Sequence, residues 1–200
     1  EILHRVPKSR LFLKCKQLKT ASVKNRVLGY FEGRGIAADR IDLEAFVPSI
    51  QDHLNLYANI DLALDTFPYN GTTTSCEALW MGVPVLTIEG NRHSGRVGLS
   101  LLNAVGLEAE FVVPDIGAYV DKAVALGHEP HSLNEIRSTL RERVAKSPLR
   151  DEIGFTRRLE GVFRDLWQRW CGGPQPTYEH KPPTPLRVDD SVQSVLGRTI

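Results

Sequence analysis

The sequence predicts an α/β protein with a doubly wound, Rossmann-like parallel sheet, on the strength of two observations. Segments with strand character alternate with segments of helical apolar spacing along most of the 200 residues. The strand-like run 60–65 is also mostly apolar, as expected for a strand covered by helices on both faces. Such alternation favours parallel strands joined by right-handed crossovers. Ligands of these sheets bind beyond the carboxyl ends of the strands, so the fold class also predicts where a site lies.

The predicted elements follow one another in the order that this fold requires. Two helices have clear end signals: Ser49 is an N-cap with Asp52 three residues later, and Gly82 with Pro84 just beyond ends the helix over 74–81. Strands are predicted at 11–14, 40–46, 60–65, 85–88 and 111–113. Further helices are predicted at 21–31, 49–57, 96–105, 116–126, 133–145 and 155–170.

The chain is expected to hold one lobe, residues 1–171, followed by a tail over 172–200. The prolines and glycines of the tail predict a flexible segment rather than a second domain. Residues 1–6 have the apolar spacing of the second half of a helix, which Pro7 ends. We therefore expect a first strand, a first loop and part of a helix to lie upstream of this chain.

Composition and missing motifs exclude several classes of protein. The net charge of +1 lacks the basic surplus of a nucleic-acid-binding protein, and no apolar run is long enough to span a membrane. Three dispersed cysteines, Cys15, Cys76 and Cys171, indicate neither a disulfide framework nor a metal site, which favours the reducing cytoplasm. Signatures of P-loop kinases, dinucleotide dehydrogenases, α/β-hydrolases and zincins are absent.

The most informative segment leaves the strand at 60–65 through a Pro/Asn/Gly turn and opens a helix with threonines. Free N–H groups at a helix start attract anions, and Gly71 allows a phosphate to approach the backbone. Glu77 lies one turn later, where its carboxylate can accept from ribose hydroxyls. The alternative is that Thr74 to Glu77 is only a capping box. The candidate donor-binding residues here are Asn70, Gly71, Thr72, Thr73, Thr74 and Glu77.

Other strand ends supply further candidates. His53 can contact a base or ribose, although a surface or partly buried histidine without a function is the simpler interpretation of this residue alone. Arg92, His93 and Arg96 suit a pyrophosphate or sugar hydroxyls, and a solvated loop has the same composition. At the first strand end Lys14 and Lys16 flank Cys15, and either one of them faces the site or both do, since residues two apart in a strand share a face.

The apolar and sulfur-containing side chains outside these loops are interpreted as packing residues. Cys15 and Cys76 are expected to act as small packing groups rather than nucleophiles. Trp80, Trp167 and Trp170 are expected to pack against helices rather than to stack on bases.

Three stretches of this sequence resemble the SPINDLY / O-linked N-acetylglucosamine transferase family. They are DLALDTFPYNGTTT at 61–74, CEALWMGVPV at 76–85 and RHSGRVG at 92–98, within a resemblance that runs from about residue 5 to 170. The resemblance implies a GT-B fold, with this chain as its C-terminal nucleotide-sugar-binding lobe.

The resemblance also implies an activity and a donor site. It implies inverting transfer of a sugar, above all N-acetylglucosamine from UDP-GlcNAc, to Ser or Thr of proteins, with no metal or other cofactor. In the family the positions of Thr73 and Thr74 bind the diphosphate, that of Glu77 lies near the ribose and that of His53 contacts the nucleoside. Lys16, Arg92 and Arg96 are candidate stabilisers of the leaving group.

The sequence departs from the animal members of the family at two places. Thr72 stands where they have histidine, and Ile50 and Leu56 stand near His53 where they have basic residues. These departures bring the chain closer to SPINDLY-like members, so protein O-fucosylation from GDP-fucose is an alternative. Three features of the family are expected to lie outside this chain. They are a lysine that binds the donor phosphate, the groups on the acceptor side, and the helical repeats that bind protein acceptors.

Two other classes of function compete with a transferase. A sugar-nucleotide epimerase has the same two-lobed fold but needs acid and base residues that we do not find here. A catalytically silent nucleotide-sugar-binding module needs only the donor site. We assign no general base within the chain, so the fragment is expected to be inactive alone.

Overall fold

The computed structural model describes residues 1–173 and divides the chain into two compact units, residues 1–155 and a second unit that begins at Thr156. The predicted domain boundary between residues 171 and 172 stays a prediction. The predicted flexibility of the tail concerns residues 174–200, which lie outside the described part of the chain.

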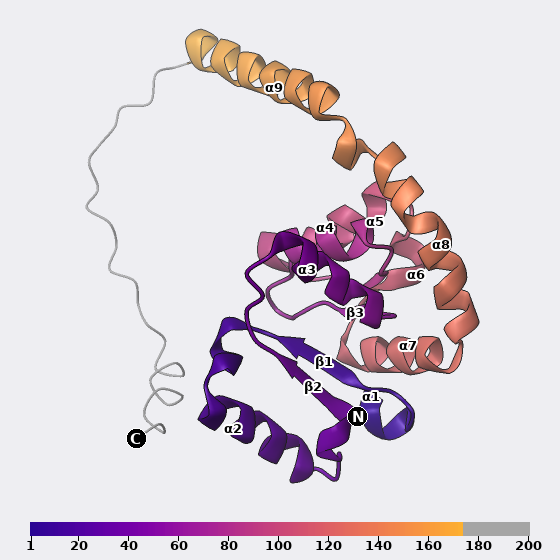
Figure 1. Cartoon of the computed structure of the whole chain (residues 1–200). Coiled ribbons are helices and arrows are strands. Elements are labelled where there is room, and N and C mark those ends of the chain that lie inside the picture. The colour runs from indigo at the N-terminus through magenta and orange to yellow at the C-terminus, as the bar shows by residue number, and fades with distance from the viewer. Residues whose placement is uncertain (174–200) are drawn as a thin grey trace. The chain divides into compact units, whose positions relative to one another are not determined.

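The elements of the first unit alternate as predicted (Figure 1). The strands are β1 Leu11–Lys14, β2 Ile41–Glu44, β3 Ala63–Leu64, β4 Val85–Ile88 and β5 Val112–Val113. The helices are α1 Ile2–Arg5, α2 Ala21–Glu32, α3 Ile50–Asn55, α4 Thr73–Trp80, α5 Val97–Ala104, α6 Glu108–Phe111, α7 Ile116–His128, α8 Pro130–Lys146 and α9 Glu152–Gly172, which crosses the unit boundary. Short 3₁₀ turns are η1 Lys16–Lys19, η2 Ala38–Arg40, η3 Leu56–Asn59, η4 His93–Gly95 and η5 Pro148–Arg150.

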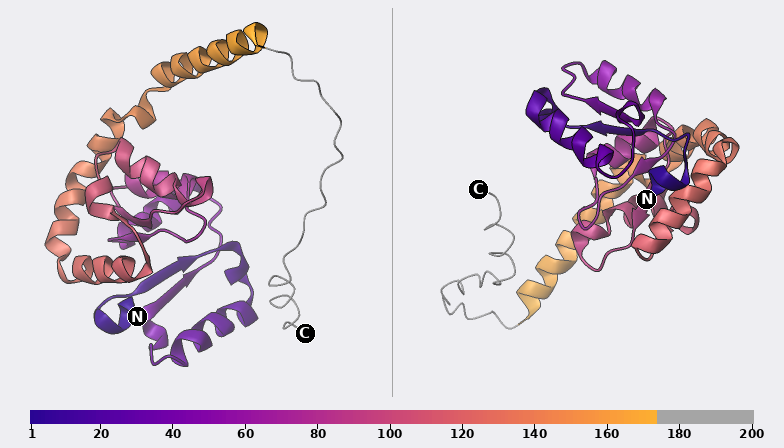
Figure 2. Two further views of the ribbon diagram at one scale, coloured as in Figure 1. Left: turned by 180° about the vertical axis from the view of Figure 1, so that it is seen from behind. Right: turned by 90° about the horizontal axis from the view of Figure 1, so that it is seen from below.

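Every strand pair in the described residues is parallel, which confirms the predicted α/β class. The strands form two sheets, β1-β2 and β3-β4-β5, rather than one continuous sheet. Helix α2 lies beside the β1-β2 pair in the further views of Figure 2. Helices α4, α5, α6 and α7 contact the central strand β4.

The division into two sheets has a topological reason. In the doubly wound strand order 3-2-1-4-5-6, the first strand separates strands 2 and 3 from strands 4 to 6. The groups β1-β2 and β3-β4-β5 agree in size and direction with the strands on either side of that position.

Three predicted strands are longer than the observed ones, and the first of them, 40–46, narrows to Ile41–Glu44. The run 60–65 narrows to Ala63–Leu64, because the Ile60 carbonyl accepts a hydrogen bond from Arg137 of α8 (2.7 Å) instead of pairing with a strand. Phe111 belongs to α6, where its N–H donates to the Leu107 carbonyl (3.1 Å). The strand at 11–14 is present, but its side chains are half-buried, with β2 as its only partner among the described residues.

The predicted helix ends are confirmed where a local motif defines them. The Ser49 hydroxyl accepts from the Asp52 N–H (3.2 Å) and caps α3. Gly82 follows α4 with a φ of +82°, a left-handed conformation that glycine adopts without strain. The N–H of Val83 then donates to the Ala78 carbonyl (2.8 Å), which closes the end of the helix.

The core of the first unit packs helices against β4. Five of its large side chains are fully buried and come from α4, β4, α5, α6 and α8: Leu79, Leu86, Leu102, Phe111 and Leu140. Trp80 contacts two guanidinium groups, those of Arg141 and Arg150, at 5.2 and 5.3 Å from its ring centre. The predicted packing role of Trp80 is confirmed.

The other two tryptophans differ from the prediction. Trp167 is 66% exposed and Trp170 is 43% exposed, because no residue of α9 is buried. Apolar spacing thus predicted the helix correctly, but it does not determine how deeply the side chains of the helix are buried.

We predict that Leu140→Ala lowers the free energy of unfolding by about 2–5 kcal/mol, since it leaves a cavity between α8 and the core. Leu149→Ala is the matched control, because Leu149 is 38% exposed, and we expect about 1 kcal/mol or less. Urea denaturation measures both. Equal losses would contradict the packing of α8 on this core.

Candidate functional site

The predicted site residues lie at the carboxyl ends of the strands. Lys14 ends β1, and α3 with His53 follows β2. The turn from Asp65 to Gly71 follows β3 and leads into α4, and the loop 89–96 follows β4. Because the strands of each sheet are parallel, these segments share one edge of their sheet.

A chain of polar contacts joins three of these elements. The His53 imidazole lies between the Lys14 ammonium, 2.5 Å from Nδ1, and the Glu77 carboxylate, 2.9 Å from Nε2. An ammonium group can only donate, so Nδ1 accepts from Lys14 and Nε2 carries the proton that is donated to Glu77. The contact chain fixes the histidine tautomer and brings His53 and Glu77 together.

Tyr57 completes this group from η3. Its hydroxyl lies 3.3 Å from both the Glu77 carboxylate and the Thr74 carbonyl. Burial, and then the charge of Glu77, raise the pKa of Tyr57, so the hydroxyl remains a neutral donor. Glu77 therefore receives hydrogen bonds from two sides and has its carboxylate fixed at the site.

The start of α4 is open to a ligand. Thr72 is the N-cap residue and its side chain makes no capping bond, so the capping-box interpretation of Thr74 to Glu77 is wrong. Thr72, Thr73 and Thr74 are exposed, and the first N–H groups of any helix lack acceptors within it. Gly71 leaves space, since a side chain there would collide with the Ser75 hydroxyl (2.7 Å). The exposed threonines and the first N–H groups of α4 thus lie at the same end of the helix.

Asn70 has a different environment from the threonines. It is 1% exposed, its oxygen accepts from the Gly98 N–H (3.2 Å), and its amide donates to the Thr66 carbonyl (3.1 Å). Its polar groups are therefore used inside the protein.

The loop after β4 carries the predicted basic residues. Arg92 and His93 are exposed, while Arg96 pairs with Glu89 at 2.5 Å. Of the two lysines at the end of β1, Lys14 faces His53, and Lys16 is exposed in η1. Lys16 and Arg92 are thus exposed cations after β1 and β4, whereas the charge of Arg96 is balanced by Glu89.

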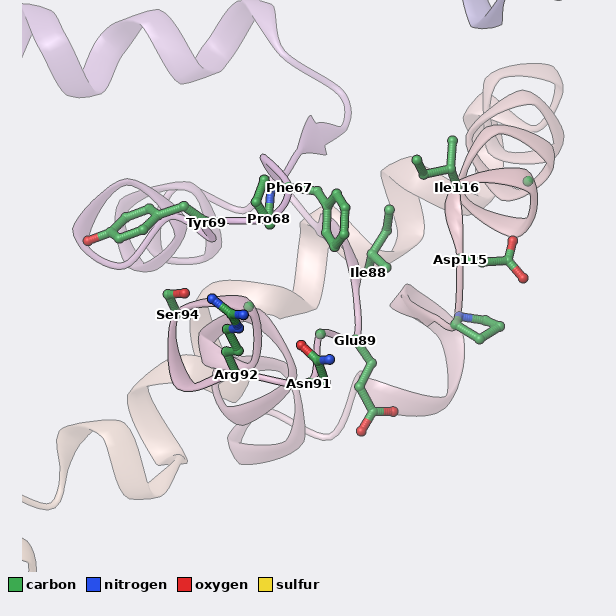
Figure 3. A pocket seen from close by; sticks show the side chains of 14 residues that line it. Phe67, Pro68, Tyr69, Ile88, Glu89, Asn91, Arg92, Ser94, Asp115 and Ile116 are labelled. Atoms are coloured by element: carbon green, nitrogen blue, oxygen red, sulfur yellow. The ribbon is translucent and has the colours of Figure 1, made fainter. Parts of the chain in front are cut away.

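A cavity of about 990 Å³ lies beside the turn that follows β3 (Figure 3). Figure 3 shows Phe67 next to Ile88, with Tyr69 and Asp115 at opposite sides. The loops after β3, β4 and β5 form its walls, and the turn at 65–71 that contributes Phe67 to the cavity leads along the chain into α4.

The described residues contain no group of three His, Cys, Asp or Glu side chains that could hold a metal ion. Independence from metals stays a prediction.

None of the helices in residues 1–173 combines the length and the apolar character needed to cross a bilayer. Cys76 is half-buried, and burial raises the pKa of its thiol, which agrees with a packing role.

Sequence reasoning missed Tyr57 and left Lys14 undecided. Tyr57 stands four residues after His53, and this helical spacing is a signal that both share one face. Lys14 reaches His53 from 39 residues away, and nothing local in the sequence indicates that contact.

Comparison with known proteins decides the family. Glycosyl transferase family 41 matches residues 1–159, most of the chain. The chain belongs to glycosyl transferase family 41. The sequence resemblance is therefore confirmed, and with it the Rossmann-like lobe of a GT-B glycosyltransferase.

Individual relatives in family 41 agree. The chain is 44% identical over 176 residues to a protein of Solanum lycopersicum named probable UDP-N-acetylglucosamine–peptide N-acetylglucosaminyltransferase SPINDLY, covering 88% of this chain and 19% of that protein. It is 32% identical over 178 residues to an Arabidopsis thaliana protein of the same description named SEC. This match covers 88% of this chain and 18% of that protein. A solved structure, a mutant of the O-GlcNAc transferase of Thermobaculum terrenum, matches with a TM-score of 0.79 at 40% identity, covering 86% of this chain and 32% of that one. The chain thus spans about a fifth of the length of the curated relatives it matches.

We predict that Tyr57→Phe lowers the free energy of unfolding by about 1 kcal/mol, because Glu77 and the Thr74 carbonyl lose a donor. Tyr69→Phe is the control, since Tyr69 is 71% exposed, and we expect no measurable change. Thermal denaturation of both variants measures the difference. A Tyr57→Phe protein as stable as wild type would mean that these contacts do not form.

Proposed function

We propose that this chain is the donor-binding part of an inverting protein O-glycosyltransferase that moves N-acetylglucosamine from UDP-GlcNAc to Ser or Thr. The observation that carries the proposal is the exposed Thr72–Thr74 start of α4, with Glu77 and His53 close by on the same edge. Relatives described as N-acetylglucosaminyltransferases support the sugar and the protein acceptor.

The proposed donor lies along this edge. Its diphosphate meets the N–H groups and hydroxyls of Thr72 to Thr74, where the positive end of the helix dipole attracts an anion. Its ribose hydroxyls donate to Glu77, and the base lies near His53. Asn70 is buried, so we assign it a positioning role instead of a direct contact.

The reaction is a direct displacement. The acceptor hydroxyl attacks the anomeric carbon, the bond from that carbon to the diphosphate oxygen breaks, and the sugar inverts. Charge that develops on the departing diphosphate is stabilised by the start of α4, with Arg92 or Lys16 as nearby cations. We propose that no metal ion is required. The proton of the acceptor passes to a base outside this chain.

A second candidate is transfer of fucose from GDP-fucose. Thr72 in place of histidine, with apolar Ile50 and Leu56 around His53, favours a different base from that of the animal enzymes. A binding module without activity would keep the same donor site.

The remaining partners follow from the same proposal. The protein acceptor is recognised by parts of the polypeptide outside this chain, and no nucleic acid is involved. We place the protein in the reducing cytoplasm, because its cysteines are free and two of them, Cys15 and Cys171, are exposed.

We predict that Thr73→Val/Thr74→Val weakens UDP or GDP binding by the full-length protein about tenfold or more, since two hydroxyl donors to the diphosphate are lost. Calorimetric titration with both nucleotides measures this, and Ser138→Ala/Thr139→Val on the exposed surface of α8 is the control. Unchanged affinity in the double variant would contradict the site.

Product analysis of the full-length protein separates the candidate functions. Transfer of N-acetylglucosamine to a peptide supports the first proposal, and transfer of fucose supports the second. Binding of a nucleotide sugar without transfer to any peptide would leave the silent module.

A further inference from the structure

Asp65 holds the turn that precedes α4. One carboxylate oxygen, Oδ1, accepts hydrogen bonds from two backbone N–H groups, those of Gly71 (2.7 Å) and Thr66 (3.0 Å). These two groups lie at opposite ends of the turn, so a single oxygen closes it. Gly71 directly precedes Thr72, the N-cap of α4, and the closed turn therefore sets where the helix begins.

The second carboxylate oxygen anchors this turn to the central strand. Asp65 Oδ2 accepts from the hydroxyl of Thr87 (2.7 Å), a fully buried residue of β4. Gly98 of α5 provides the space, since a methyl group there would overlap the Thr87 hydroxyl and lie 2.7 Å from Asp65 Oδ2. Any side chain at Gly98 would displace the carboxylate from its position.

Asn70 forms a second anchor within the same turn. The side-chain oxygen of Asn70 accepts a hydrogen bond from the Gly98 N–H. The backbone N–H of Asn70 donates to the Ser94 carbonyl (2.9 Å) in the loop after β4. The turn is thus fixed to the segment that carries Arg92 and His93 as well as to the start of α4.

We propose that Asp65 is a positioning residue for the donor diphosphate. Asp65 fixes the start of α4 through the turn at 66–71. This inference rests on the proposed function. Asp65 does not touch the donor, because its oxygens are taken by Gly71, Thr66 and Thr87. It acts by keeping the N–H groups and hydroxyls of Thr72 to Thr74 in one arrangement before the donor arrives.

The electrostatics of Asp65 support a role beyond holding the fold together. Burial raises its pKa, and the hydrogen bonds from Gly71, Thr87 and Thr66 only partly oppose that rise. A carboxyl group whose pKa is raised by folding reduces stability as the pH climbs through that pKa. In the described part of the chain no lysine or arginine pairs with it. A buried carboxyl group whose pKa is raised by its surroundings is more frequent at functional sites than elsewhere.

The test compares two ligands on the full-length protein. We expect Asp65→Ala to weaken binding of UDP or GDP about tenfold or more, while uridine or guanosine, measured by competition, stays within about twofold. The nucleosides lack the diphosphate and depend on His53 and Glu77, so a selective loss identifies positioning of the phosphate site. Asp61→Ala is the control, because Asp61 is exposed and lies only four residues earlier.

Thr87 provides an independent pair of variants, which decides the question if Asp65→Ala does not fold. Thr87→Val removes the hydroxyl that Asp65 accepts and should show the same selective loss, whereas Thr87→Ser keeps the hydroxyl and should bind like wild type.

Three outcomes would overturn the inference. Unchanged diphosphate affinity in the folded variants would show that the turn needs no carboxylate. Equal weakening of diphosphate and nucleoside would assign Asp65 a purely structural role. A wild-type protein that binds neither UDP nor GDP would overturn the proposed function itself, and this inference with it.

Discussion

Strand β4 is buried along its whole length, and a buried strand must have its backbone groups hydrogen-bonded on both edges. It meets this constraint by pairing with β3 and β5 in parallel, which brings the loops after these three strands to one edge. Thr87 on β4 then anchors Asp65, and Asp65 closes the turn that leads into α4. The position of the exposed threonines therefore depends on the pairing and burial of this strand.

Much of the fold was predictable because local signals define it. Strand β4 has the predicted bounds, and the Ser49 cap and the Gly82 stop act as their motifs indicate. The shortened β3 was not predictable, because its neighbour Ile60 has a carbonyl that accepts a hydrogen bond from Arg137. This arginine lies on α8, 77 residues away. The separation into two sheets likewise depends on long-range topology and not on the character of any single segment.

The candidate site was predictable to a similar degree. Helical position and residue type pointed to the start of α4 and to Glu77, and strand ends pointed to His53. Their connection was not predictable, since Lys14, His53 and Glu77 come from three elements. The capping-box motif was misleading, because the structure uses Thr72 as the N-cap and leaves the hydroxyls exposed. Short motifs identify residues, while tertiary contacts decide their roles.

We propose that the donor lies across the start of α4 with its nucleoside toward Glu77 and His53. The decisive experiment is a crystal structure of the full-length protein with UDP or GDP. We predict diphosphate oxygens within hydrogen-bonding distance of Thr73 and Thr74, and ribose hydroxyls on the Glu77 carboxylate. A nucleotide bound away from α4, for instance wholly within the cavity beside Phe67, would contradict the account.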